Sequence, residues 1–283
     1  MNLLKGILSF YRVRDWIKNL GFLFISLTIG VSPSEILLLF CLGIVQGIFL
    51  FSFLFSFNDF GDHIVNNEKN FIGYLMDNAI LSKNIILFLY SLPLILSTIP
   101  LIFNTSMNYL IFYGLFIIIS IAYSAPRIRL RDLPIIDIIC NVLIFTSAFF
   151  LSYFFVNPNL VLKTYFFLLW VSLYVFSHEI LHQISDFEKD RKSGRNSTII
   201  RLGKKKSISF FKFTISISLM SGLVIFFAYP TLRILSGIMI LFSSIRFFYF
   251  LRFDEKSDFR RSRNRLDGII EGSLYFILNL LKV

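Results

Sequence analysis

The first group of residues that could do chemistry is a short polar cluster, Asn58-Asp59-Phe60-Gly61-Asp62, which is followed by Asn66. It comes directly after a long apolar run that ends at Phe57. If the helix of that run continues, the four carboxylate and amide side chains lie on one helical face. Such oxygens suit Mg²⁺, which prefers one or two carboxylates, water and the phosphates of a substrate. The alternative is an ordinary helix end with solvated acids.

A second polar cluster lies much later in the chain. It contains Glu179, His182, Gln183, Asp186 and Asp190, whose spacing keeps them on one helical face that runs out of an apolar segment. Ionisable residues at membrane depth usually face a cavity. Asp186 and Asp190 would repel each other unless they share a cation. Two such faces with an apolar body behind them predict a site for a phosphorylated headgroup on a long hydrocarbon tail.

Two basic segments could contribute to the same site. In residues 123–131, Tyr123 is followed by arginines 127, 129 and 131, which alternate with apolar residues. Guanidinium groups in such a row can bind phosphate oxygens, although a plain basic loop would look the same. The segment 12–19 contains two arginines, Trp16, Lys18 and Asn19. Its simplest interpretation is a positive anchor with an interfacial tryptophan.

The composition indicates a membrane protein. Of 283 residues, 56% are hydrophobic and 16% are charged, which is too apolar for one soluble domain. The net charge of +11 comes from short basic loops between apolar runs, so it indicates topology signals and lipid-headgroup contacts, not nucleic-acid binding. Cys41 and Cys140 lie inside apolar runs, which excludes a disulfide framework and a cysteine-type zinc site. The N-terminus shows no cleavable signal pattern, so the first run is expected to remain as a helix.

Nine apolar runs are long enough to cross a bilayer as helices. They cover about 16–31, 35–57, 84–103, 107–125, 133–155, 163–184, 208–229, 231–251 and 266–282. Basic residues precede the first run and follow the second, fourth, sixth and eighth, whereas the other connections contain none. This alternation predicts that the N-terminus and all charged loops are cytoplasmic. The predicted fold is therefore an all-α, multi-pass integral membrane protein, in the cell membrane if the source is prokaryotic.

A third motif points to different chemistry. His178-Glu179-Ile180-Leu181-His182 matches H-E-x-x-H, in which two histidines bind Zn²⁺ and the glutamate acts as general base. Asp267 could supply a third ligand, as in site-2-type intramembrane proteases. A zinc protease would leave both aspartate clusters and the arginine loop unexplained. A non-enzymatic membrane protein is the remaining alternative.

Taken together and in order, the motifs resemble the UbiA-type intramembrane prenyltransferase superfamily. Asn58-Asp59-x-x-Asp62 is similar to the family's N-D-x-x-D-x-x-x-D motif, with Asn66 in place of the last aspartate. Residues 123–131 are similar to its Y-S-x-P-P-x-R-L-K loop, and 186–197 to its D-x-x-x-D-x-x-x-G-x-x-T motif. The resemblance covers nearly the whole chain. It implies one domain, 1–283, with about nine transmembrane helices around a central cavity open to the cytoplasmic side.

The resemblance also implies a reaction: Mg²⁺-dependent transfer of an isoprenoid chain from a prenyl diphosphate to an aromatic or other lipophilic acceptor. Mg²⁺ would neutralise the leaving diphosphate as the C–O bond ionises, and aromatic side chains would accompany the allylic cation. The implied metal ligands and catalytic residues are Asp59, Asp62, Asp186 and Asp190. The implied substrate-binding residues are Asn58, Asn66, Arg129, Arg131, Lys18, Tyr123 and Gln183.

Two departures leave the substrates open. Arg12-x-Arg14-x-Trp16-x-Lys18-Asn19 is similar to the opening of the branch that transfers phosphoribosyl groups from phosphoribosyl diphosphate to a polyprenyl phosphate. The basic R-P segment usual after the first motif is also missing, with Tyr74-Leu75 in its place. One cationic contact to the donor diphosphate is therefore not accounted for by the sequence.

Overall fold

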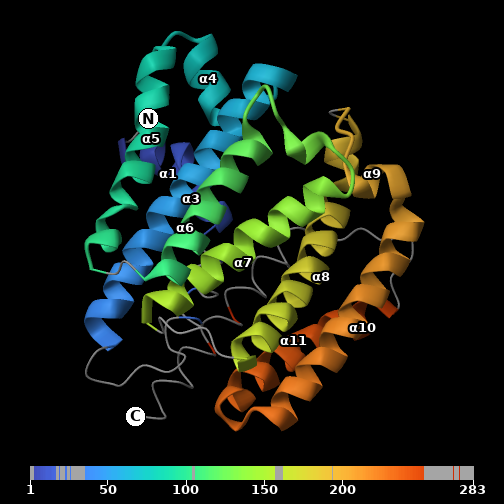
Figure 1. Ribbon diagram of the computed structural model, residues 1–283. Helices are drawn as coiled ribbons and strands as arrows, with labels where there is room; N and C mark the ends of the chain where they lie inside the picture. The colour runs from blue at the N-terminus through green and yellow to red at the C-terminus, as the bar shows by residue number, and fades with distance from the viewer. Residues whose placement is uncertain are drawn as a thin grey trace.

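The computed structural model describes residues 3–16, 19, 23, 26, 36–103, 106–156, 162–192, 194–251, 270 and 274, and these contain helices and no strand (Figure 1). The α-helices are α1 (Leu3–Phe10), α3 (Ile36–Asn66), α4 (Phe71–Asp77), α5 (Lys83–Leu96), α6 (Met107–Ser124), α7 (Ile136–Val156), α8 (Leu162–Lys192), α9 (Thr198–Leu202), α10 (Lys204–Ala228) and α11 (Arg233–Leu251). Three short 3₁₀ helices, η1 (Ile99–Ile102), η2 (Leu130–Asp132) and η3 (Pro230–Leu232), complete them. The all-α prediction is confirmed for this part of the chain.

Six of the described helices are long and apolar enough to cross a membrane. They are α3, α5 with η1, α6, α7, α8 and α10. Large apolar side chains such as Ile102, Met107 and Phe227 are more than two-thirds exposed, as expected for a surface that faces lipid. The eighth predicted run corresponds to α11. Most of the first run and the ninth lie outside the described residues, so the count of nine remains a prediction.

Two of the spanning helices extend beyond their apolar runs. Helix α3 continues nine residues past Phe57, to Asn66, and α8 continues past residue 184 to Lys192. The prediction of one polar face assumed that the helix continues past Phe57, and the extension of α3 to Asn66 confirms this assumption. The helix ends, α4, the α6–α7 connection and α9 lie at the same end of the bundle in Figure 1. Both aspartate clusters are therefore held on rigid helices at one end of the molecule.

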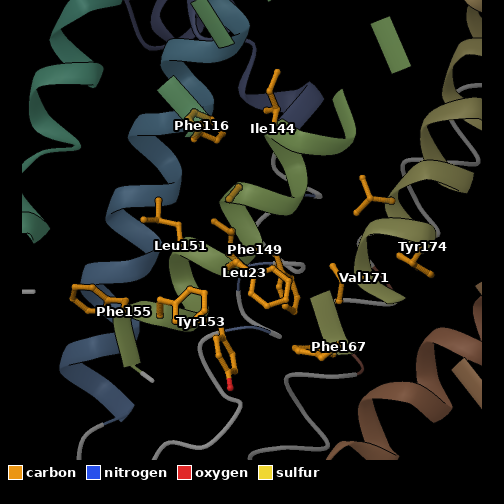
Figure 2. Packing of buried hydrophobic residues seen from close by; sticks show 14 of the residues in the cluster. Leu23, Phe116, Ile144, Phe149, Leu151, Tyr153, Phe155, Phe167, Val171 and Tyr174 are labelled. Carbon is orange, nitrogen blue, oxygen red and sulfur yellow. The ribbon is translucent and has the colours of Figure 1, made fainter. Parts of the chain in front are cut away.

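The interior of the bundle is an aromatic core. Phe51, Phe116, Phe149, Phe150 and Trp170 are fully buried where α3, α6, α7 and α8 meet. Figure 2 shows this packing, with rings from α7 directed towards both α3 and α8. Contacts between aromatic rings stabilise the packing by more than the burial of their apolar area alone would give. The core fixes the spacing between α3 and α8, which carry the two aspartate clusters.

Gly61 sets how closely α3 approaches α6. A Cβ at this position would overlap the carbonyl oxygen of Ser124 and would lie 3.9 Å from Arg129 Nη1. The overlapped atom is backbone, so it cannot move aside as a flexible side chain would. Gly61 therefore allows the α6–α7 connection to reach the polar face of α3.

We expect Gly61→Ala to lower both the melting temperature and the activity. The added methyl group forces α3 and α6 apart, and overpacking of this kind typically costs about 1–3 kcal/mol. Thermal unfolding of the purified protein in detergent measures the effect. Gly114→Ala is the matched control, because a Cβ at Gly114 in α6 meets no atom within 4 Å. Equal melting temperatures for the two variants would contradict the close approach at Gly61.

Candidate active site

One cavity of about 460 Å³ opens between α3, α7 and α8 and contains most of the polar residues singled out from the sequence. Its lining is divided in character. Towards the loops it is lined by acidic and basic side chains, and deeper in the bundle by Leu54, Phe55, Phe145 and Val175, with Arg246 beside Tyr174 at the same level. Altogether eight acidic and six basic side chains line it. The cavity can thus take a ligand with a charged head and an apolar tail.

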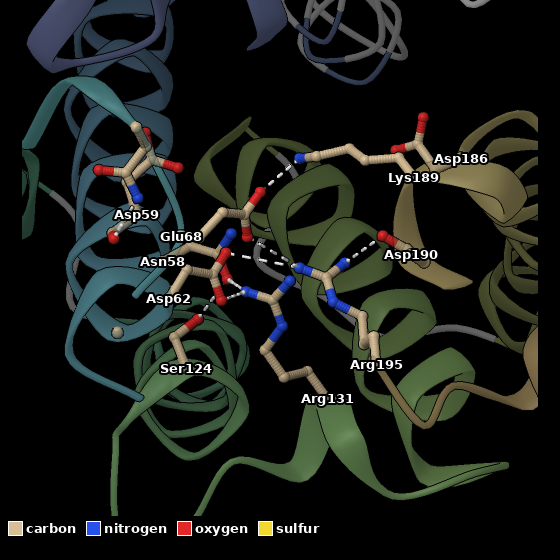
Figure 3. Close-up of polar contacts among 12 residues, drawn as sticks. Asn58, Asp59, Asp62, Glu68, Ser124, Arg131, Asp186, Lys189, Asp190 and Arg195 are labelled. Carbon is tan, nitrogen blue, oxygen red and sulfur yellow. Dashed lines mark hydrogen bonds and ion pairs between the residues drawn. The ribbon is translucent and has the colours of Figure 1, made fainter. Parts of the chain in front are cut away.

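The α3 side of the cavity carries Asp59 and Asp62, each paired with an arginine. Arg12 Nη1 donates to Asp59 Oδ1 at 2.8 Å. Arg131 Nη1 donates to Asp62 Oδ1 at 2.5 Å and also to Asn58 Oδ1 (Figure 3). Asp59 and Asp62 are 8% and 3% exposed. Buried carboxylates need such partners, because burial of an unpaired charge is costly.

The α8 side carries Asp186 and Asp190, which line the same cavity. Arg195 Nη1 donates to Asp190 Oδ1 at 3.1 Å, and His182 Nδ1 lies 3.9 Å from Asp186 Oδ2. The structure therefore brings the predicted carboxylates of both helices to one cavity. Among the described residues, no three His, Cys, Asp or Glu side chains are placed to hold a metal ion by themselves.

The two arginines predicted to bind substrate occupy different places. Arg131 lines the cavity, and its guanidinium lies 5.7 Å from the centre of the Tyr123 ring. Arg129 is buried behind the cavity wall and has a left-handed backbone conformation, with φ of 42°. Its side chain binds Gly61 O at 3.0 Å and Asp132 Oδ2 at 2.6 Å. Arg129 thus braces the chain around Asp62 and is not among the residues that line the cavity.

Asn66 also lies away from the cavity, although it was expected to assist the metal site. It is exposed at the last position of α3, and the chain turns there through Asn67, which has φ of 51°. The turn directs Glu68 into the cavity instead. Lys189 Nζ lies 2.6 Å from Glu68 Oε1, and this bond links the two sides of the site.

The charge of Glu68 is fixed by its surroundings. Burial raises the pKa of this carboxyl, but the hydrogen bond and charge of Lys189, together with Arg131 and Arg12, outweigh it and lower the pKa below its usual value. Glu68 is therefore ionised at neutral pH. It adds a carboxylate to the cavity that the sequence motifs did not indicate.

Further polar residues form a hydrogen-bonded chain across the cavity wall. Asn141 Nδ2 donates to Tyr123 Oη at 2.9 Å and to Glu179 Oε1 at 2.7 Å, and Gln183 Nε2 donates to the same Glu179 oxygen at 3.2 Å. Tyr123 and Gln183 thus line the cavity as expected of substrate-binding residues. Lys18 lies outside the described residues.

The H-E-x-x-H motif does not form a zinc site. His178 Nε2 is 2.7 Å from Arg246 Nη1, Glu179 accepts hydrogen bonds from Asn141 and Gln183, and His182 is directed towards Asp186. The three side chains therefore have separate partners and do not converge on one point. The proposed third ligand, Asp267, lies outside the described residues. The zinc-protease alternative is not supported.

Sequence reasoning missed several polar residues that line the cavity, among them Glu68, Asn141, Arg195 and Arg246. Arg246 carried a usable signal, because it is an arginine inside the eighth apolar run. It is 4% exposed and donates to Tyr174 Oη at 3.1 Å. The others follow from loop and helix geometry that spacing alone does not give.

Comparison with known proteins finds similarities that cover most of the chain. The sequence model of the UbiA prenyltransferase family matches residues 20–269. No curated protein matches the sequence. Among solved structures, a UbiA homolog from Archaeoglobus fulgidus bound to GPP and Mg²⁺ is 20% identical, with a TM-score of 0.84 and 98% of each chain covered. The same homolog bound to DMAPP and Mg²⁺ gives 19% identity, a TM-score of 0.83 and 98% coverage of each chain.

A lower structural similarity is found to a structure from work on digeranylgeranylglyceryl phosphate synthase in membranes. It is 19% identical to this chain, with a TM-score of 0.65 and 100% of each chain covered. At these identities the structural matches establish a shared fold, and the match to the family's sequence model establishes the relationship.

Proposed function

The chain belongs to the UbiA prenyltransferase family, and from this membership we propose that it transfers an isoprenoid chain from a prenyl diphosphate to an aromatic or other lipophilic acceptor, with Mg²⁺ as cofactor. The observation that carries the proposal is the arrangement of the cavity. Acidic faces of α3 and α8 meet at its charged end, with Arg131 and Arg195 between them, and apolar side chains line its deeper part. A prenyl diphosphate has the matching division into anionic head and apolar chain.

The charged end of the cavity fits Mg²⁺. Its candidate ligands are hard carboxylate oxygens, and Mg²⁺ commonly takes only one or two carboxylates besides water and substrate phosphates. Acidic side chains already outnumber basic ones in the cavity lining by two, and a diphosphate brings further negative charge. Additional cations would therefore favour binding of the donor. We assign the binding of Mg²⁺ to Asp59, Asp62, Asp186 and Asp190. Mg²⁺ bound there would stabilise the charge that develops on the leaving diphosphate.

The protein's own residues have complementary roles in this proposal. Arg131 donates hydrogen bonds to diphosphate oxygens, while Arg129 keeps Asp62 in position from behind the cavity wall. Arg12 supplies a cation beside Asp59 in a chain that lacks the basic segment usual after the family's first motif. Leu54, Phe55 and other apolar residues accommodate the isoprenoid chain and exclude water from the reacting carbon.

We also propose the orientation of the site. The charged end of the cavity is formed by the basic connections, which follow the positive-inside pattern. The cavity then opens to the cytoplasmic side, where a water-soluble diphosphate headgroup and Mg²⁺ are available. The full count of nine helices and the single domain over 1–283 belong to the same proposal.

Labelled prenyl diphosphates and a membrane lipid extract, incubated with purified protein, test the function. We expect a labelled lipid product that requires Mg²⁺ or Mn²⁺, disappears with EDTA and persists with a zinc-selective chelator. Carboxylate ligands favour these hard cations over zinc. Activity that depends on tightly bound zinc and is lost in His182→Ala would contradict the assignment.

A second candidate is phosphoribosyl transfer to a polyprenyl phosphate. The observation that favours it is the position of the N-terminal motif: Arg12, Asp15 and Asn19 line the cavity, and Arg12 contacts Asp59. Both candidates use a diphosphate donor and a long isoprenoid, so the metal requirement does not separate them. Labelled phosphoribosyl diphosphate with a polyprenyl phosphate in the same assay does.

A further inference from the structure

The connection between α8 and α9 places Arg195 at the centre of the charged end of the cavity. Its guanidinium contacts carboxylates from three segments: Asp190 Oδ1 at 3.1 Å, Asp62 Oδ2 at 3.5 Å and Glu68 Oε2 at 3.7 Å. Figure 3 shows it between Asp190 on one side and the other two acids on the opposite side. One arginine thus links the acidic faces that α3 and α8 present to each other.

The backbone on both sides of Arg195 is fixed. Arg195 N donates to Asp190 O at 3.1 Å, and Gly194 has φ of +72°, which a residue with a side chain rarely adopts. On the other side, Thr198 N donates to the buried carboxylate of Asp137 at 2.9 Å, at the start of α7. The side chain is therefore directed into the cavity by anchors on α8 and α7.

Arg195 is held more loosely than Arg131. Two of its three carboxylate contacts are 3.5 and 3.7 Å long, beyond good hydrogen-bond distance, whereas Arg131 lies 2.5 Å from Asp62. Arg195 Nε is buried without a hydrogen-bond partner among the described residues. Among the described residues, only its contact with Asp190 is at good hydrogen-bond distance, so this guanidinium can change partners at the loss of a single short ion pair, and its Nε–H is left for another acceptor.

We propose that Arg195 acts as an exchangeable counter-ion: it neutralises Asp62 and Asp190 before the donor enters and then transfers its hydrogen bonds to the donor's diphosphate. The proposal rests on the proposed function. Mg²⁺ would use the same carboxylate oxygens as Arg195, so metal alone must compete with the guanidinium. A diphosphate relieves the competition, because it offers the guanidinium new oxygens in bidentate geometry. Metal and diphosphate therefore bind with positive coupling, and Arg195 is a positioning residue for both.

Binding of Mn²⁺, measured by electron paramagnetic resonance in the presence and absence of inorganic diphosphate, tests this coupling without turnover. In the wild type we expect weak Mn²⁺ binding that strengthens with diphosphate. In Arg195→Gln, Mn²⁺ alone should bind about tenfold more tightly, and the added effect of diphosphate should fall by a similar factor. Arg195→Lys keeps the charge but loses the planar fork, so its Mn²⁺ affinity without diphosphate should lie between the two.

Arg191→Gln is the matched control. It removes the same charge four residues earlier, from an exposed side chain that is not among the residues lining the cavity. Equal Mn²⁺ affinities in Arg195→Gln and Arg191→Gln would overturn the exchange. Failure of the wild type to bind Mn²⁺ with or without diphosphate would instead contradict the proposed function. If Arg195→Gln does not fold, the comparison of Arg195→Lys with wild type decides, and unchanged coupling there overturns the proposal.

Discussion

Replacement of any one of Asp59, Asp62, Asp186 or Asp190 by asparagine is expected to abolish most turnover while the protein stays folded. Each change removes a negative charge from the charged end of the cavity, and the loss of one preorganised electrostatic group typically lowers kcat by about 10²–10³-fold. Asparagine keeps a carbonyl oxygen that can accept the existing arginine hydrogen bonds. Initial rates with saturating Mg²⁺ measure the effect, and size-exclusion chromatography in detergent checks folding.

Glu179→Gln is the control for these variants. Glu179 also lines the cavity, but hydrogen bonds from Gln183 on α8 and Asn141 on α7 hold it in the cavity wall, away from the arginine-linked carboxylates. We expect a milder loss, of less than about tenfold. The assignment is wrong if Glu179→Gln is inactive while Asp62→Asn and Asp190→Asn retain activity, because that is the pattern of a zinc protease with Glu179 as its base.

The double variant Asp62→Asn/Asp190→Asn adds a second check. The two residues come from different helices but share Arg195 and the same charged end of the cavity. When residues act as one unit, loss of one already removes most of their joint effect. The kcat of the double variant should therefore be only slightly below that of the more damaging single variant. Multiplication of the two single effects would indicate independent roles.

The sequence indicated the site's helical parts well. The one-face argument for Asp59 and Asp62 depended only on continuation of α3, and the spacing of Gln183, Asp186 and Asp190 depended only on α8. Helical periodicity is a local property, so it can be read from spacing. The meeting of the two faces in one cavity is not a local property. It could be predicted only from the order of the motifs and from their position on the same side of the membrane.

The errors in the site fall where the chain leaves a helix. Asn66 was placed by motif position, but α3 ends there, and the left-handed turn at Asn67 sends Glu68 into the cavity instead. Arg129 and Arg131 looked equivalent in the sequence. The left-handed backbone of Arg129 and the 3₁₀ turn that follows direct only Arg131 to the cavity. Such turns are determined by tertiary contacts, which spacing does not reveal.

This difference between the two arginines gives the second large expected effect. Arg131→Lys should raise KM for the prenyl diphosphate at least about tenfold and also lower kcat, because charge-assisted hydrogen bonds contribute about 1.5–3 kcal/mol each. The guanidinium of Arg131 contacts Asn58 and Asp62 together and retains an Nε–H without a partner among the described residues. A single ammonium group cannot hold both residues and a diphosphate oxygen in the same planar geometry.

Arg129→Lys is the same chemical change two residues earlier, at a side chain that binds Gly61 O and Asp132 from outside the cavity and contacts Asp62 only at 3.4 Å. It should lower the melting temperature but leave KM of the folded protein close to the wild-type value. The two variants therefore separate binding of the diphosphate from support of the fold, since each should change mainly one of the two measurements. A rise in KM as large for Arg129→Lys as for Arg131→Lys would show that both arginines reach the donor, and the division of roles proposed for them would then be wrong.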